Sequence, residues 1–159
     1  MEADATNGTT AYVLVAVGNQ SQNKFDVNLQ LGAFKGVADK IKADVVKVDD
    51  EYVVTAVADD KGNADKTDDV STITFTFDEA IQDAFVTEAT FEVNNGDNAV
   101  TSVVIVGNAV TLTVKGLIYE NDTVELVGTI YDNSVAGTTA NKTVGLVMDV
   151  QAVTEGTIE

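Results

Sequence analysis

One loop of the sequence concentrates side chains that could bind a metal ion. Oxygen-bearing side chains crowd the stretch DDKGNADKTDD, at Asp59, Asp60, Asn63, Asp65, Asp68 and Asp69. Carboxylate and carbonyl oxygens are the ligands that Ca²⁺ takes in proteins, so this stretch predicts a Ca²⁺ site. The spacing is not that of an EF-hand loop, because the alternating acidic positions and the terminal Glu are lacking. The alternative interpretation is that Asp, Asn and Gly only form the turns of the loop.

A second, sparser group of oxygen ligands lies further along the chain. Glu120, Asn121 and Asp122 come together, and Asp132 and Asn133 follow the next predicted strand. The same two interpretations apply to this group, and the turn-forming one is favoured more strongly here because the residues are fewer.

The residue types that most catalytic sites need are missing. His, Cys, Trp and Arg do not occur, which removes Ser–His and Cys–His nucleophile pairs, imidazole metal ligands and arginine clamps. Carboxylate pairs could support glycoside hydrolysis, but no Asp or Glu is distinguished from the many others. We therefore expect no enzyme and no catalytic or organic-cofactor site; Ca²⁺ is the one cofactor that the sequence favours.

The charge of the chain limits its partners. Acidic residues number 26 against 9 basic ones, all of them Lys, for a net charge of −17. Binding of nucleic acid needs clustered basic residues, so no nucleic-acid partner is expected. The same charge disfavours anionic lipid, and no apolar stretch is long enough to cross a membrane. Like charges repel one another in the compact state, and salt or divalent cations relieve that repulsion.

The residues that could bind Ca²⁺ must be positioned by strands. Val, Thr and Ile are abundant and Pro is absent, a composition that suits β-strands. Alternating or continuous apolar patterns predict an all-β fold class. Apolar residues spaced by three and four predict one short helix over 33–43. The expected strands are 10–17, 24–31, 44–48, 51–58, 70–77, 85–93, 122–130 and 142–150, together with a hairpin over 99–116.

The hairpin is the clearest structural signal in the chain. Gly107 and Asn108 separate two alternating runs, and a two-residue loop that begins with Gly suits a type II′ turn. The register then pairs Val106 with Ala109 and continues to Thr101 with Val114. One face is apolar and is expected in the core, with Val103, Ile105, Val110, Leu112 and Val114. The other is mixed: Ser102, Val104, Val106, Ala109, Thr111 and Thr113 would meet solvent, a neighbouring molecule or the N-terminal region.

The spacing of the strands predicts how the chain divides. Residues 51–150 supply the number of strands that a small immunoglobulin-like β-sandwich needs. Residues 1–50 are too few for a second sandwich and are expected to form a small β-rich region or docking arm, and 151–159 a tail. The start of the chain is not a signal peptide. We expect Met1 to stand before a mature fragment; the alternative is that the chain is not secreted by that route.

Residues 51–150 resemble the bacterial immunoglobulin-like domains repeated in surface-layer (S-layer) and other cell-surface proteins. The resemblance lies in VSTITFTFDEAI (70–81), ATFEVNNG (89–96), AVTSVVIVGNAVTLTVKGL (99–117) and DTVELVGTIYDN (122–133). The family's last loop carries Asp-x-x-Gly-Asn, whereas this chain reads YDNSVAGTTAN. The resemblance implies a β-sandwich, a lattice or stalk role and dependence on Ca²⁺.

These observations together predict a structural role. The first hypothesis is a non-enzymatic module of an extracellular cell-surface array, S-layer-like, whose partners are copies of itself or other structural proteins. The second is a phage virion or decoration protein, in which residues 1–50 dock on the particle and 51–150 project from it. A carbohydrate- or host-binding adhesin module is a further alternative. Exposed strand edges in a chain without Pro offer a route to assembly.

Overall fold

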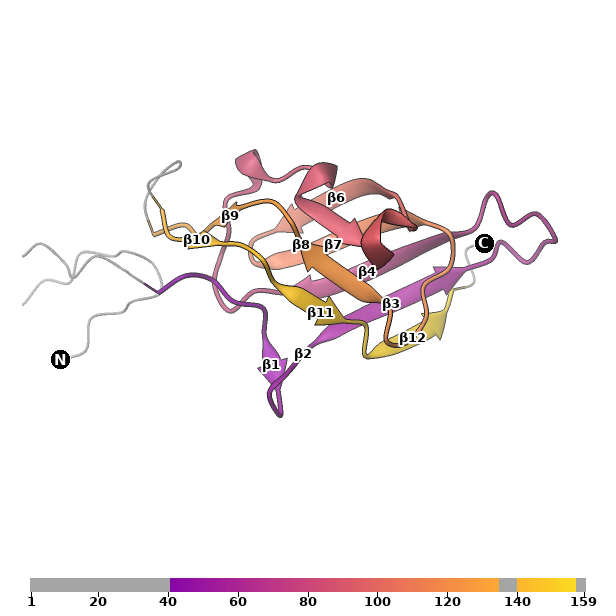
Figure 1. The fold of residues 1–159 in the computed structure, drawn as a ribbon, viewed down its shortest axis with the longest axis horizontal. Helices are drawn as coiled ribbons and strands as arrows, with labels where there is room; N and C mark the ends of the chain where they lie inside the picture. Colours follow the sequence, from indigo (N-terminus) through magenta and orange to yellow (C-terminus); the bar gives the residue numbers. More distant parts are fainter. Residues whose placement is uncertain (1–40, 135–139, 157–159) are drawn as a thin grey trace, which may run out of the picture.

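The computed structural model describes residues 41–134 and 140–156 of the chain (Figure 1). Strands dominate this part, and its helical segments are three-residue 3₁₀ turns, so the expected all-β fold class is confirmed. In chain order the elements are β1 (Lys47–Val48), β2 (Glu51–Tyr52), β3 (Val54–Asp59), β4 (Val70–Thr76), η1 (Asp83–Phe85), η2 (Glu88–Thr90), β5 (Phe91–Val93), η3 (Asn94–Gly96), β6 (Val100–Val106), β7 (Ala109–Lys115), β8 (Thr123–Leu126), β9 (Ile130–Tyr131), β10 (Lys142–Thr143), β11 (Val147–Asp149) and β12 (Ala152–Glu155).

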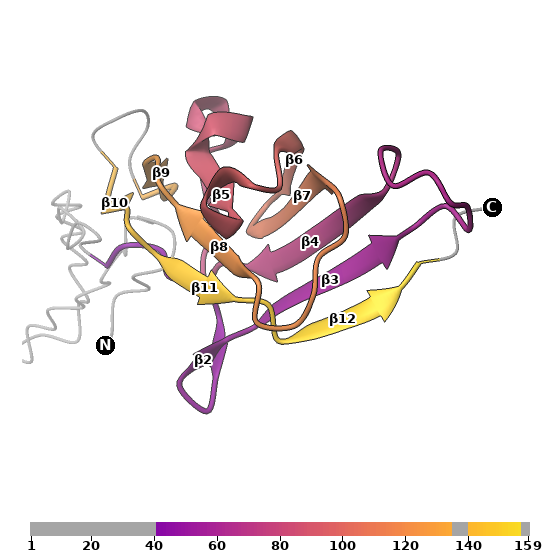
Figure 2. The same ribbon diagram turned by 45° about the vertical axis from the view of Figure 1, so that its right-hand side comes forward.

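Two sheets make up most of the molecule. One has five strands in the order β12-β3-β4-β7-β6, and the other has three in the order β11-β8-β5. Two short ribbons, β1–β2 and β9–β10, are added to them. Neighbouring strands are antiparallel except for β12, which runs parallel to β3. Figure 2 shows β8 and β11 forming a layer apart from β3, β4 and β12.

A single hydrophobic core lies between the two sheets. The ring of Phe75 on β4 contacts the ring of Phe91 on β5 edge to face, with centroids 5.7 Å apart, so the contact joins the two layers. Phe75 also contacts Phe77 at 6.0 Å. Both sheets direct buried side chains into this core: Val54, Ala56, Ile73, Val110, Leu112 and Val114 from one and Val93, Val124, Leu126 and Met148 from the other. The arrangement is therefore sandwich-like.

The hairpin formed by β6 and β7 follows the predicted register through most of its length. Val106 pairs with Ala109, and the pairing continues in step to Ser102 with Thr113. Gly107 has a φ of +66°, while Asn108 stays outside the positive region, as a type II′ turn requires. The register shifts at Thr101, so that Val100 and not Thr101 faces Val114. This β-bulge corrects the last predicted pair; the Thr101 hydroxyl donates to the Thr113 carbonyl, 3.1 Å away.

The predicted strand over 85–93 is mostly wrong. Only Phe91–Val93 form a strand, and Ala89, which alternation along 85–93 would place on the inner face with Phe91 and Val93, is exposed. The backbone N–H of Thr87 donates to the Thr90 hydroxyl at 2.9 Å, and the N–H of Thr90 donates to the Thr87 carbonyl at 2.9 Å. These local hydrogen bonds close the 3₁₀ turn η2 and replace the sheet bonds that an extended backbone would have needed.

Two further predicted strands are shorter than expected. The strand over 122–130 divides into β8 and β9 because the N–H groups of Val127 and Gly128 both donate to the Thr90 carbonyl, at 3.1 and 3.0 Å. The strand over 142–150 divides into β10 and β11 around Gly145, which has a φ of +69°. A left-handed residue interrupts the extended backbone, and glycine adopts it without a Cβ clash.

The predicted strands 10–17 and 24–31 lie outside the described residues, as does most of the predicted helix over 33–43; its described part, 41–43, is not helical. Within the predicted N-terminal region 1–50, Ala43 and Val45 are buried in the core, and Val45 bridges to Phe77. Within the predicted tail 151–159, residues 152–155 form β12. Both ends of the described chain therefore pack against residues 51–150: Ala43 and Val45 enter the core, and β12 joins the five-stranded sheet.

Candidate functional site

The predicted Ca²⁺ ligands lie on the long loop that joins β3 to β4 and projects from one end of the molecule (Figure 1). Asp59 and Asp69, at the two roots of the loop, are buried, with 3% and 4% of their surface exposed. The four predicted ligands between them are exposed: Asp60, Asn63, Asp65 and Asp68. The six residues thus divide between the sheet end and the tip.

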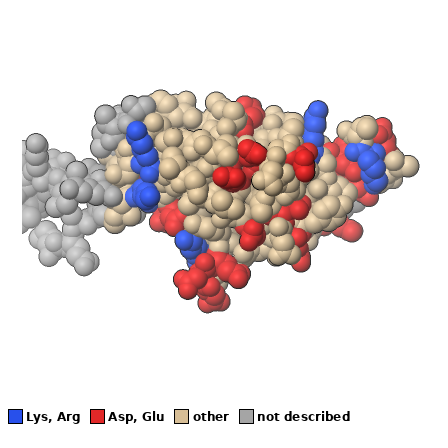
Figure 3. Space-filling model, viewed as in Figure 1, with Lys and Arg blue, Asp and Glu red and all other residues tan. Residues whose placement is uncertain are grey.

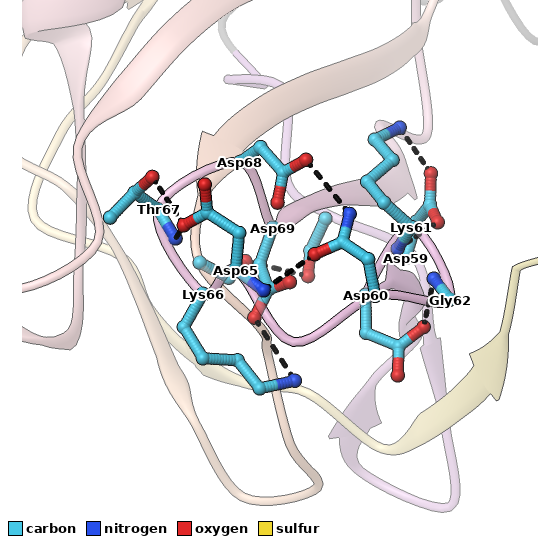
Figure 4. Close-up of polar contacts among 12 residues, drawn as sticks. Asp59, Asp60, Lys61, Gly62, Asp65, Lys66, Thr67, Asp68 and Asp69 are labelled. Carbon is cyan, nitrogen blue, oxygen red and sulfur yellow. Dashed lines mark hydrogen bonds and ion pairs between the residues drawn. The ribbon is translucent and has the colours of Figure 1, made fainter.

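Short-range hydrogen bonds occupy most of these side chains (Figure 4). The Asp60 carboxylate accepts from the N–H of Gly62 at 2.9 Å, and the Asn63 side chain from the N–H of Asp65 at 2.6 Å. Asp65 accepts from both the N–H and the hydroxyl of Thr67, at 2.9 and 2.6 Å, and these bonds lower its pKa because they favour the ionised form. Each bond spans two residues, as in an Asx turn.

The remaining side chains pair with cations or amides of the same loop. Lys61 forms an ion pair with Asp59. The Nζ of Lys66 lies 3.8 Å from Asp69 Oδ2, while Asp69 Oδ1 has no hydrogen-bond partner. Asn63 donates to Asp68 at 3.0 Å. Within residues 41–134 and 140–156, no group of three or more acidic side chains is arranged to hold a metal ion. The geometry as it stands favours the turn-forming interpretation, and Ca²⁺ binding stays a prediction.

The ion pair between Asp59 and Lys61 gives a pH-dependent prediction. The side chain and the backbone N–H of Lys61 both donate to the Asp59 carboxylate and hold its pKa below the usual value near 3.8. Because the pKa of Asp59 is lower in the folded state, the ion pair stabilises the folded protein at pH values above the usual carboxyl pKa of 3.8. This stabilisation is lost as the pH falls from 3.8 through the lowered pKa of the folded state. Lys61→Ala should raise the pKa of Asp59 towards its usual value, as NMR titration of the carboxyl carbon would show. Lys66→Ala is the control, and an equal shift in both variants would contradict the assignment.

The second predicted group is not brought together. Asp122 precedes β8 and accepts from the N–H of Tyr119 at 2.8 Å, whereas Asp132 follows β9. Asp132 is only 1% exposed. Its Oδ1 accepts from the N–H of Ser134 at 3.0 Å, from the hydroxyl of Ser134 and from the N–H of Asn141 at 3.2 Å; Oδ2 has no partner. Asp132 therefore ties together the two ends of the loop between β9 and β10.

The outer surface of the five-stranded sheet is uncharged over its central rows, and we call it the neutral face. Its side chains alternate with those of the core and align across the strands. One row runs Val57, Thr72, Thr113, Ser102 and the next runs Thr55, Thr74, Thr111, Val104. Thr76, Ala109, Val106, Ala152 and Thr154 also belong to this face, and the row at its end, Asp59, Val70 and Lys115, is charged. Val57, Val104 and Val106 are 42%, 52% and 72% exposed, so no described segment covers them.

The neutral face ends at an open strand edge. β6 is the last strand of the sheet and pairs only with β7 among the described elements. Its sequence, VTSVVIV, contains no charged residue and no Pro. Charged side chains and Pro are the usual protections of an exposed strand edge. The bulge at Thr101 protects only the beginning of the strand. Among the described residues, Ser102–Val106 therefore form sheet hydrogen bonds only with β7, beside exposed valine side chains, while η2 packs close to β6. Alternation in the sequence predicted the mixed face, but not that β6 stands at the edge.

Comparison of the chain with family models, curated proteins and solved structures gave no match. Membership of the immunoglobulin-like surface family therefore remains a prediction from the motifs. In the described part of the chain, no helix is long and apolar enough to span a membrane.

Proposed function

We propose that the protein is a non-enzymatic structural protein of an extracellular surface assembly and that it associates with copies of itself. The observation that carries the proposal is the neutral face with its edge strand β6, which has no charged residue and no Pro. On a molecule with a net charge of −17, the central rows of this face carry no charge and include exposed valines. Exposed apolar patches bordered by polar residues are typical of interaction surfaces.

The distribution of charge supports contact at this face. Figure 3 shows acidic side chains on the β1–β2 hairpin, towards the loop between β3 and β4, and over the visible face between them. In the described sequence these segments contain Asp49, Asp50 and Glu51, and the acidic residues of 59–69. Copies that approached through such segments would repel one another. The neutral face avoids that repulsion.

The order of the strands supports an immunoglobulin-like type of sandwich. β3, β4, β7 and β6 are neighbours in one sheet, and β5, β8 and β11 make up the other. Numbered A to G along the chain, this is the A-B-E-D and C-F-G arrangement of immunoglobulin domains. We include this fold type in the proposal because it agrees with the motifs that resemble bacterial surface domains.

A virion or decoration protein is the alternative that the shape also favours. The described chain begins at Ile41, near β10, since the Asn141 side chain donates to the Ile41 carbonyl at 2.8 Å. The loop between β3 and β4 projects at the opposite end (Figure 1). A module attached near Ile41 would thus present its acidic loop outwards. Position of the gene among capsid genes would favour this alternative over a cell-surface array.

Sedimentation velocity of the full chain over a range of concentrations tests the proposal. We expect oligomers whose fraction rises with concentration and with added NaCl, because salt screens the repulsion between acidic copies. Electron microscopy of the same samples should show sheets or filaments if the oligomers extend. Parallel runs in Ca²⁺ and in EDTA test the predicted divalent dependence. A monomer at every concentration and ionic strength would refute self-association.

A further inference from the structure

We propose that two copies of the protein pair antiparallel through β6, so that Val104 of one copy faces Val104 of the other. The two five-stranded sheets would then form one continuous sheet with the neutral face along one side. This inference rests on the proposed self-association and names its contact.

The free backbone groups of β6 define what a partner can bind. In a two-residue hairpin, the pair beside the turn exchanges both of its hydrogen bonds, and bonded pairs then alternate along the strands. Val106, Val104 and Ser102 therefore bond to β7. The N–H and C=O groups of Val103 and Ile105 point away from β7, in the plane of the sheet. They are ready to form a ladder with an added strand.

Charge selects β6 from the edges of the two sheets. The opposite edge of the larger sheet, β12, carries Glu155, and the two edges of the smaller sheet, β5 and β11, carry Glu92 and Asp149. Pairing any of these strands with its own copy would bring like charges close together across the ladder, which is destabilising. β6 has no charged residue. It is also longer than any of the other three.

Charge also selects a second copy as the occupant. An acidic partner would find no basic side chain on β6 to pair with, so charge gives such a partner no preference for this strand. The run Val103-Val104-Ile105 is, by contrast, nearly symmetrical about Val104. A two-fold axis there uses the same patch on both molecules, which is the commonest symmetry of protein dimers.

The register follows from the free backbone groups. With the axis at Val104, Val103 of each copy exchanges both hydrogen bonds with Ile105 of the other. Ser102 then faces Val106, and the pairing ends where the bulge begins at Thr101. Val104 faces itself as a non-hydrogen-bonded pair, in which Cα atoms are about 4.5 Å apart. The exposed side chains of Val104 and Val106 lose contact with water.

Single cysteines test this register, because the chain has no native cysteine. In the full chain, Val104→Cys should form a disulfide-linked dimer on mild oxidation, since a Cα separation of about 4.5 Å lies within disulfide geometry. Val57→Cys is the matched control, on the same neutral face but in the interior strand β3. It should remain mostly monomeric on a non-reducing gel. Efficient cross-linking of Val57→Cys with none of Val104→Cys would overturn the inference in favour of face-to-face stacking.

Glutamate variants separate the failure of this inference from that of the proposed function. Val104→Glu places like charges opposite each other in the paired state and should abolish the dimer peak in sedimentation, while Val57→Glu should retain it. If both variants and the wild type associate equally, self-association stands and the β6 contact is refuted. If the wild type is monomeric throughout, both proposals fail.

Discussion

Phe75→Ala is expected to lower the free energy of unfolding by about 3–5 kcal/mol. The side chain is buried on β4 and contacts Phe77, just after the end of that strand, and Phe91 on the opposite sheet. Truncation removes the apolar surface of the ring and leaves a cavity between two sheets that cannot collapse freely. Since domains of this size are stable by about 5–15 kcal/mol, the variant should lose a large part of its stability.

Urea unfolding followed by circular dichroism measures this loss. Val57→Ala is the control, because Val57 is 42% exposed on the neutral face of the same sheet and contributes little to the core. It should change the free energy of unfolding by about 0.5 kcal/mol or less. A similar small change for Phe75→Ala would mean that the two sheets do not share one core.

Asp132→Ala is expected to destabilise the protein by about 1–3 kcal/mol, because it removes the acceptor of two partly buried N–H groups. Oδ1 of Asp132 accepts from the N–H groups of Ser134 and Asn141, at 3.0 and 3.2 Å. Without that oxygen, both N–H groups lose their acceptor. The loop between β9 and β10 should therefore open more easily, with faster amide hydrogen exchange at these two residues.

Asp132→Asn is the matched variant. Its side-chain oxygen can take the place of Oδ1, and its amide takes the place of Oδ2, which has no partner. We expect its stability to lie within about 1 kcal/mol of the wild type, with slow exchange at Ser134 and Asn141. Equal losses in the Ala and Asn variants would show that the negative charge, and not the acceptor oxygen, holds the loop.

The features that the sequence predicted best depend on the period-two alternation of strands. The pattern around Gly107 was sufficient to predict the register from Val106 to Ser102 because a slip by one residue would exchange the core and solvent faces. The alternation in VSTITFTF likewise predicted a strand over 70–77, and β4 spans Val70–Thr76. These predictions needed only local information, since neighbouring side chains in a strand point to opposite faces.

The remaining features depend on contacts that are distant in sequence or on competing hydrogen bonds. The Thr87–Thr90 turn replaced an expected strand because a side-chain hydroxyl took the bond that a neighbouring strand would have supplied. The position of β6 at an edge depends on the order of all the strands, which alternation does not encode. The acidic loop left two interpretations open, with turn formation favoured over a Ca²⁺ site, because the same residues form turns and bind cations.

The parallel pairing of β12 with β3 has a mechanical consequence. The register runs from Ala152 opposite Thr55 to Glu155 opposite Ala58, and Gly156 donates to the Ala58 carbonyl at 2.7 Å. The chain enters β3 at one end of this pair and leaves β12 at the other. Tension between the two ends of the domain therefore loads the pair in shear, so its hydrogen bonds resist together and cannot open one at a time. In a chain anchored at both ends, we expect this pair of strands to carry the applied force.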